Sequence, residues 1–347
     1  MTRLIETRFV IMRNGADFGE LYPAEGSLPV IRMDAEMSVK TSMSGEFAMD
    51  DRVSWLSDKI RAELIIDGTV YPLGVFLPVS VRWSETETTK TVNVEAYDQC
   101  WQLDDTKTEG IMHFSAGTNY IEAVKLLLTM AGIALVSSTA NPATIQEDRE
   151  DWEVGTSFLD IINQLLSEIN YNPLWFNASG VAVLEPASVP TAENIEHTID
   201  TDDPTCLVLP TLSNEVDAFD APNVFICVCS NADKSGPMIA KSENTNPQSP
   251  LSIARRGRRI VRLYQVSNIA SQAELEAYAE RLRNESMISG ESFHVMTALH
   301  PGHGVNDVVA FHHRDTTAIC IETAWAMSLG PGGDMTHTLE KVVYNLG

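Results

Sequence analysis

Four histidines near the end of the sequence come closest to the spacing of a metal site. These residues are His300, His303, His312 and His313. A zinc site needs three or four converging ligands, and Asp307 or Asp315 would have to supply a carboxylate. The adjacent pair 312–313 would point to opposite faces of a strand, so at most one member could join such a site. We therefore interpret the four as turn and surface histidines and predict that the chain binds no metal.

Two acidic runs, at residues 147–151 and 200–203, could supply paired carboxylates for glycoside cleavage. That reaction needs two carboxylates about 5–10 Å apart, one of them in an apolar pocket. Both runs lie in polar segments, where carboxylates stay solvated and ionised. The sequence also lacks the Gly-x-Ser-x-Gly and His-Glu-x-x-His patterns of two large hydrolase classes. We predict no catalytic residues, no cofactor and no enzymatic activity.

The densest basic patch in the chain is a group of four arginines. They are Arg255, Arg256, Arg258 and Arg259. Neighbouring guanidinium groups repel one another in water, so the group favours a partner that presents carboxylates, ideally in bidentate pairs. One hypothesis is a docking edge for another protein. The alternative is a solvated loop, or a contact within the chain to its acidic middle part.

The net charge of the 347-residue chain is −24 and is unevenly distributed. Residues 111–215 hold 15 acidic and 2 basic side chains, which is −13 of the total. This middle third is expected to be a separate, strongly solvated unit. An acidic chain lacks the excess of Lys and Arg that phosphate groups require, so we predict no specific binding of nucleic acid.

Length and hydrophobicity predict two or three folded domains. Hydrophobic residues make up 44% of the chain, which is ample for packed cores. No stretch approaches the roughly 18 apolar residues of a membrane helix, and the first residues lack the apolar core of a secretory signal. We therefore expect a soluble cytoplasmic product without membrane insertion. The five cysteines, at positions 100, 206, 227, 229 and 320, lack ligand spacing and are interpreted as buried reduced thiols.

Residues 62–105 predict an antiparallel meander of three strands, around which the first part of the chain is organised. Asp67-Gly68 tolerates the positive φ of a tight hairpin turn. Apolar and polar residues alternate on both sides of a second, polar turn at 84–88. Short apolar runs precede the meander, and the alternation over residues 35–42 predicts a strand there. These features indicate an all-β domain.

The pattern becomes helical in the middle of the chain. Asn119 is placed to cap a helix that ends at Gly132, and a second helix is expected from Ser157 to about Asn170. A predicted hairpin over residues 173–184 follows. Two helices and a hairpin indicate a small α+β unit.

The last part of the chain returns to strands. Residues 223–228 and 260–266 predict strands, whereas the polar, proline-containing segment 231–252 predicts a long loop. Ser271 is placed to cap a third helix. The final segments alternate at period two, over residues 292–299, 305–312, 318–329 and 336–344.

Residues 74–76, 83–85 and 94–98 resemble the end of the first barrel in the hub proteins of bacteriophage tails and related phage-tail-like particles. Segments 116–120 and 152–156, which precede the two middle helices, are similar to that family too. The resemblance covers most of the chain. It implies a trimeric ring in which two tail-tube-like barrels per chain match a six-fold tube. It also implies a channel for DNA, whose acidic wall would repel the DNA rather than trap it.

We therefore predict an α+β, mainly β fold with two tail-tube-like antiparallel β-barrel domains and an inserted small α+β domain. The first barrel is assigned to residues 1–105 and the inserted domain to residues 106–200. The second barrel is assigned to residues 201–347, with one helix and the long loop at 231–252. The predicted function is a structural tail hub that joins the tail tube to the spike or tip.

The expected partners are other copies of the chain in a trimer, the tail tube or a distal tail protein, the spike or tip protein, and the tape-measure protein. The four arginines are the predicted contacts. The expected location is the virion tail, after assembly in the host cytoplasm. One alternative is a tail-associated cell-wall hydrolase. Another, a carbohydrate-binding β module, would need clustered exposed aromatics, whereas the six tryptophans (55, 83, 101, 152, 175 and 325) lie scattered among apolar neighbours and are interpreted as core.

Overall fold

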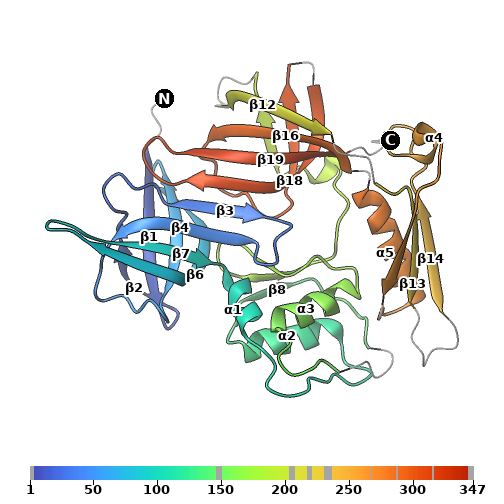
Figure 1. The fold of residues 1–347 in the computed structure, drawn as a ribbon, viewed down its shortest axis with the longest axis horizontal. Coiled ribbons are helices and arrows are strands. Elements are labelled where there is room, and N and C mark those ends of the chain that lie inside the picture. The colour runs from blue at the N-terminus through green and yellow to red at the C-terminus, as the bar shows by residue number, and fades with distance from the viewer. Residues whose placement is uncertain are drawn as a thin grey trace.

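A 13-stranded sheet contains strands from both ends of the chain (Figure 1). The computed structural model describes residues 4–145, 151–202, 208–216, 221–229, 237–266, 268–286, 288–314 and 316–342. The long path of the sheet has the order β12-β16-β19-β18-β3-β4-β7-β6-β5-β1-β2, with β17 and β11 branching from β18. Two smaller sheets and the helices lie beside it. The predicted α+β, mainly β class is confirmed.

The first seven strands form one β unit, drawn in blue and cyan in Figure 1. They are β1 (Ile5–Arg13), β2 (Ala16–Leu21), β3 (Val30–Asp34), β4 (Thr41–Ala48), β5 (Lys59–Ile66), β6 (Thr69–Glu85) and β7 (Lys90–Tyr97). The predicted meander is confirmed as β5-β6-β7, and Asp67 and Gly68 both have positive φ. After β2, the Ala24 N–H donates to the Glu46 carbonyl, and the Ala48 N–H donates to the Tyr22 carbonyl. These bonds to β4 close the unit on itself.

The strand predicted over residues 35–42 is wrong for most of its length, because β4 begins only at Thr41. The Asp34 carboxylate accepts a hydrogen bond from the Glu36 N–H at 2.9 Å, and this local bond turns the chain. The turn is completed by the Asp34 N–H, which donates to the Lys40 carbonyl. An alternating pattern cannot distinguish such a turn from a strand.

The middle of the chain folds as the predicted helix-helix-hairpin unit, with a short helix before it. Its elements are α1 (Gln99–Asp105), α2 (Tyr120–Met130), β8 (Val136–Ser138), α3 (Phe158–Ser167), β9 (Trp175–Phe176) and β10 (Ala182–Leu184). Asn119 caps α2, as predicted, and Ser157, expected as the first residue of the second helix, instead caps α3. The strand β8, which was not predicted, pairs with β10 in parallel. The apolar faces of the helices share one buried core with this three-stranded sheet.

The second β unit uses the last part of the chain and one earlier segment. It contains β11 (His197–Asp200), β12 (Val208–Val216), β16 (Ile288–Ala298), β17 (Val308–His313), β18 (Thr316–Ser328) and β19 (Asp334–Val342), and the short 3-10 helix η1 (Ala192–Asn194) precedes it. One edge of β18 pairs with β17 along its first half and with β3 along its second half. The other edge pairs with β19. Strand β18 therefore connects the two β units.

A separate three-stranded sheet is inserted between β12 and β16, together with the short helix α4 and the longer helix α5. Its elements are β13 (Val224–Cys229), β14 (Met238–Glu243), α4 (Ile253–Arg256), β15 (Val261–Val266) and α5 (Gln272–Glu285). Helix α5, capped by Ser271 as predicted, packs against this sheet and not inside the second β unit (Figure 1). The prediction of a loop over residues 231–252 is wrong for residues 238–243, which form β14. The sequence of this strand is mostly polar, because only Ala240 and Ser242 are buried against the sheet.

Asp98 connects the first β unit to the middle unit. Its carboxylate accepts hydrogen bonds from the Thr41 N–H of β4 and from the Cys100 N–H of α1, both at 2.8 Å. Complete burial raises the pKa of Asp98 to about 6, against the effect of these donors. At neutral pH the ionised carboxylate therefore caps α1 and fixes it to the sheet. This role gives a physical reason for an aspartate at the end of segment 94–98.

Four cysteines are buried thiols, as predicted: Cys100, Cys227, Cys229 and Cys320. Burial raises the pKa of the Cys320 thiol to about 12. Cys206 lies outside the described residues. The interpretation of all tryptophans as core is wrong for Trp83, whose exposed fraction is 67%. Within the described residues, no helix has the length and apolar content needed to cross a bilayer.

Gly74 lies at a position of β6 that leaves no room for a side chain. A Cβ added there would lie 2.6 Å from a ring atom of the fully buried Phe76, in a backbone conformation with φ +142°. We expect Gly74→Ala to lower the free energy of unfolding by about 2 kcal/mol or more, through steric overlap and backbone strain. Urea denaturation measures this loss. Gly19→Ala in β2 is the matched control, since open space surrounds Gly19, and an equal loss in both variants would contradict the steric explanation.

Candidate functional site

A carboxylate with two histidines is completely buried inside the second β unit. Glu322 of β18 is 0% exposed. One of its oxygens lies 2.5 Å from His303 Nδ1, and the other lies 2.5 Å from His337 Nδ1. Nε2 of His337 lies 2.7 Å from the Thr297 hydroxyl oxygen. Both carboxylate oxygens are therefore bound by ring nitrogens in a space without solvent.

The protonation of this cluster follows from its partners. Burial opposes ionisation of Glu322, but the hydrogen bonds from His303 and His337 outweigh it and hold the pKa of the carboxyl below its ordinary value. Burial also lowers the pKa of His303, although the bond to Glu322 acts in the opposite direction. Near neutral pH the cluster therefore contains an ionised Glu322 and a neutral His303 that donates its Nδ1–H. This tautomer leaves Nε2 of His303 with a lone pair.

Two further histidines extend the cluster toward solvent. Nδ1 of the exposed His300 lies 3.1 Å from Nε2 of His303. The ring of His197, from β11, stacks on the ring of His303 with 3.9 Å between the centroids. Nε2 of His197 lies 3.0 Å from a carboxylate oxygen of Asp307. Burial opposes protonation of His197, but the bond to Asp307 and its charge outweigh it and raise the pKa of this ring.

Strand pairing positions these side chains. The parallel pairing of β11 with β17 places His197 beside the start of β17, close to Asp307. Asp307 also accepts the Gly304 N–H at 2.6 Å, and the Gly304 carbonyl accepts the Trp325 indole N–H at 2.9 Å. These two bonds hold the second half of the loop 299–307 in place. It lines a cavity of about 30 Å³ together with residues of β6, β9 and the Asp98 junction, where the three parts of the chain meet.

The structure joins only part of the predicted histidine group. His300 and His303 come together, and Asp307 lies beside them, as the metal hypothesis would require. His312 and His313 instead contact the hydroxyl groups of Thr317 and Thr201. Asp315 lies outside the described residues.

His197, Glu322 and His337 were not identified as site residues from the sequence. For Glu322 and His337, the alternation of buried and exposed positions along their strands could have identified them. Glu322 shares the parity of Cys320 in β18, and His337 shares the parity of Met335 and Leu339 in β19, so each places a polar group on an inward face. His197 carried no comparable signal, because β11 is short and its partner β17 is more than 100 positions away.

The four predicted contact arginines surround the end of α4, on the surface of the inserted sheet. Arg259 makes a bidentate ion pair with Glu243, at 2.6 and 3.1 Å. Arg255 donates to the Pro247 carbonyl and Arg256 to the Ala221 carbonyl. The side chain of Arg258 is exposed and makes no hydrogen bond or ion pair with any described residue. The group is therefore partly used within the chain, and Arg258 is available at its surface.

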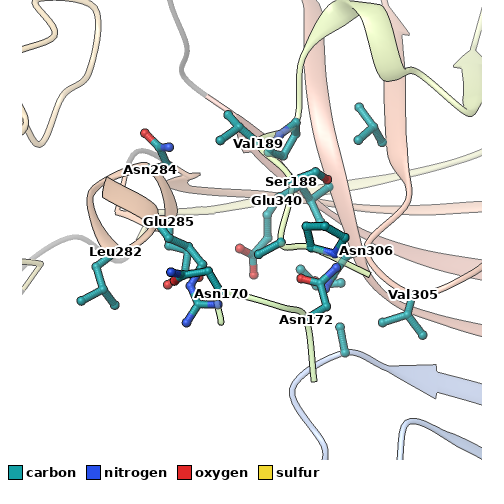
Figure 2. A pocket seen from close by; sticks show the side chains of 18 of the residues that line it. Asn170, Asn172, Ser188, Val189, Leu282, Asn284, Glu285, Val305, Asn306 and Glu340 are labelled. Carbon is teal, nitrogen blue, oxygen red and sulfur yellow. The ribbon is translucent and has the colours of Figure 1, made fainter. Parts of the chain in front are cut away.

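A large cleft separates α5 and the inserted sheet from the second β unit (Figure 2). Its volume is about 1720 Å³, and seven acidic side chains and two arginines line it. Figure 2 places Glu285 and Glu340 on facing walls. Surrounding protein raises the pKa of both carboxyls, although the Glu285 side chain keeps 55% of its surface in contact with solvent.

None of the described residues of the two acidic runs lines this cleft. Residues 146–150 and 203–207 lie outside the described residues. Asp151 faces His113 at 2.6 Å in an exposed contact, and Asp202 is exposed. Neither is one of the residues that line the cleft. These carboxylates stay solvated, as expected.

Comparison with known proteins shows the fold. No family model and no curated protein matches the sequence. Among solved structures, a tail protein from Neisseria meningitidis is similar with a TM-score of 0.65 and 14% identity, over 96% of both chains. A 43 kDa tail protein of prophage MuSo2 from Shewanella oneidensis gives 0.63 and 12% identity, over 96% of this chain and 98% of the other.

A third structure comes from a secretion system. It is an Escherichia coli component of the type VI system, described as structurally similar to two bacteriophage T4 tail proteins. Its TM-score is 0.54 at 10% identity, over 97% of this chain and 77% of the other. The chain therefore has the fold of phage tail proteins, and the resemblance read from residues 74–98 is confirmed at the level of the fold.

Proposed function

We propose that this chain is a structural hub of a phage tail or phage-tail-like particle, in which three copies form a ring between the tail tube and the spike or tip. The observation that carries the proposal is the likeness to two tail proteins, one of them from a prophage, which extends over at least 96% of each chain. A likeness that includes both β units and both inserted units favours the same structural role. In this proposal the protein is not an enzyme.

The architecture supports a ring with two β units per chain. Because β18 pairs with β3, the two units have a fixed mutual orientation, which a rigid ring requires. Three chains would then present six β units to a six-fold tube, and closed symmetry would stabilise contacts that are weak singly. We also propose the division near residues 105 and 200, with the sheet of β13, β14 and β15 as a further inserted part of the last domain.

The proposed ring leaves a central channel for DNA. The excess of acidic side chains, −24 for the whole chain, would keep the DNA from adhering to the wall. The partners in this proposal are the tail tube or a distal tail protein, the spike or tip protein, and the tape-measure protein. The location is the baseplate or tip of the virion tail, after assembly in the host cytoplasm.

The oligomeric state tests the hub directly. Light scattering and negative-stain imaging of the purified chain, alone and mixed with the tube and spike proteins of the same tail, measure the number of copies and their symmetry. We expect a ring of three chains with a central hole, formed by the chain itself or on one of these proteins. A chain that stays monomeric with both proteins present would overturn the proposal.

Substitution of Arg258 tests whether the four arginines form a docking surface for another protein. Arg258→Glu reverses the charge of an exposed side chain that has no partner among the described residues. If this surface docks on carboxylates of a neighbouring protein, we expect the affinity for that protein to fall about tenfold or more, because like charges then face each other. Sedimentation of the chain with itself and with the tube and spike proteins measures the change.

Arg82→Glu is the control, because Arg82 is an exposed arginine of β6 in the other β unit. An equal loss in both variants would indicate a general effect of charge. Unchanged association of Arg258→Glu in every mixture would exclude the four arginines as a docking edge.

A cell-wall hydrolase is the second candidate, and the cleft of Figure 2 is the observation that favours it. Glu285 and Glu340 face this cleft, and the pKa of each is raised, as a general acid requires. Release of dye from labelled peptidoglycan, by the chain and by its Glu285→Gln and Glu340→Gln variants, separates the two candidates. The hub proposal expects no release by any of them. Release that either substitution abolishes would establish the hydrolase instead.

A further inference from the structure

We propose that His197, His300 and His303 form a binding site for one divalent transition-metal ion of the zinc type. One ring nitrogen from each histidine lies within 4.8 Å of the other two. The three residues come from β11 and from the loop 299–307, so a bound ion would fasten the start of the second β unit to the place where the three parts of the chain meet. The site is separate from the proposed docking surface, whereas Asp307, beside His197, also lines the cleft.

The spacing of two of the nitrogens already suits a metal. His300 Nδ1 and His303 Nε2 are 3.1 Å apart. Two imidazole ligands at about 2.0–2.1 Å from a tetrahedral zinc ion have their nitrogens about 3.3 Å apart. In the structure a single proton must occupy the line between these two nitrogens. A metal ion can replace that proton with a shift of a few tenths of an ångström.

Two carboxylates orient the rings of His303 and His197, each by a hydrogen bond with one ring nitrogen. Glu322 accepts from His303 Nδ1, and Asp307 lies 3.0 Å from His197 Nε2. Glu322 fixes the tautomer of His303 and leaves its Nε2 with a lone pair, whereas Asp307 holds Nε2–H of His197, so an ion would bind Nδ1 of His197 in place of a proton. A carboxylate behind a ligating histidine is the usual arrangement in protein zinc sites, where it also increases the basicity of the ligand. The cluster therefore has the outer layer of a metal site as well as its ligands.

One ring has to move for the site to close. The rings of His197 and His303 are nearly parallel, at 14°, so their in-plane lone pairs cannot meet at one point. The His197 ring must tilt toward the ion, away from its contact with the buried Asp307, which the Gly304 N–H holds in place. The exposed His300 provides the path by which an ion enters. An open path and one mobile ligand are compatible with binding after folding.

The inner cluster of His303, Glu322 and His337 does not offer the same site. All three residues are buried, and both oxygens of Glu322 already accept ring N–H groups at 2.5 Å. An ion there would have to displace two strong hydrogen bonds without access from solvent. The chemistry of three neutral imidazoles selects zinc, copper, nickel or cobalt over magnesium and calcium, which prefer oxygen ligands.

Metal titration of the tag-free full chain tests the proposal. The chain is stripped with a chelator and titrated with Zn²⁺ in a calorimeter, and Co²⁺ absorption then reports the number and type of ligands. We expect one Zn²⁺ per chain and a Co²⁺ spectrum typical of nitrogen ligands. His300→Gln should reduce the affinity at least tenfold, because it removes a ligand, and Asp307→Asn should reduce it by about 10–100-fold through the orientation of His197.

The control variant is His294→Gln, which removes another exposed histidine of the same β unit, on β16. It should bind Zn²⁺ as the unchanged chain does. Because His300 is exposed, circular dichroism should show the same fold for its variant. The proposal is overturned if the chain binds Zn²⁺ no more tightly than His300→Gln does, or if His294→Gln loses as much affinity.

Discussion

Glu322→Ala is expected to destabilise the folded chain by about 3–5 kcal/mol. The substitution leaves the Nδ1–H groups of His303 and His337 without an acceptor in a space that is closed to solvent. Each unsatisfied buried donor costs about 1–3 kcal/mol, and the removed side chain leaves a cavity as well. Urea denaturation at neutral pH measures the loss.

Two substitutions show whether the hydrogen bonds are responsible. Glu322→Gln should cost clearly less, because the amide oxygen still accepts from one ring, and His337 can change tautomer by donating Nε2–H to Thr297. Glu95→Ala on the exposed face of β7 should change the stability by no more than about 0.5 kcal/mol. If Glu322→Ala unfolded at the same urea concentration as Glu95→Ala, the buried cluster would not contribute to stability.

Trp325→Ala is expected to cost about 3–5 kcal/mol by the loss of a large buried side chain. Trp325 belongs to β18 but lies in the core of the first β unit, and its indole N–H donates to the Gly304 carbonyl. The substitution therefore removes contacts between the two β units and releases the loop that carries His303. We expect urea unfolding to lose cooperativity, so that fluorescence and far-UV circular dichroism no longer change together.

Trp83→Ala is the matched control, because this tryptophan is 67% exposed at the end of β6. It should change the stability by about 0.5 kcal/mol or less. An equal loss in the two variants would mean that the loss of a tryptophan, and not the junction, is measured. Coincident transitions in Trp325→Ala would show that β3 and β18 hold the units together without it.

Much of the fold could be predicted from local patterns. The hairpin at Asp67-Gly68 and the helix caps Asn119 and Ser271 depend on neighbours in sequence, so the residue types alone identify them. Residues 35–40 show the limit of prediction from local patterns. Their apolar and polar residues alternate as in a strand, but they form a turn that begins with the hydrogen bond to the Asp34 carboxylate. The pairing of β18 with β3 left no trace that a single sequence reveals, since either strand would read the same beside another neighbour.

Only His300 and His303 of the candidate site could be predicted from the sequence to lie close together. His300 and His303 are three positions apart, and their proximity follows from the turn between them. Glu322 and His337 come from neighbouring strands, where the register pairs Glu322 with Leu339, two positions from His337, and His197 comes from a parallel pairing over more than 100 residues. Register and strand order are tertiary properties, so a histidine count near the end of the sequence could not reveal a cluster built from four segments.

The pairing of β3 with β18 also has a consequence during protein synthesis. Asp34 and Ala324 are register partners, although 290 positions separate them in the chain. A ribosome that adds about 5–20 residues per second needs about 15–60 seconds to cover that distance. During this time β3 presents an unpaired edge, which invites pairing with another nascent chain. Nascent chains on neighbouring ribosomes of one message would therefore depend on chaperones or on slow initiation until the last strands emerge.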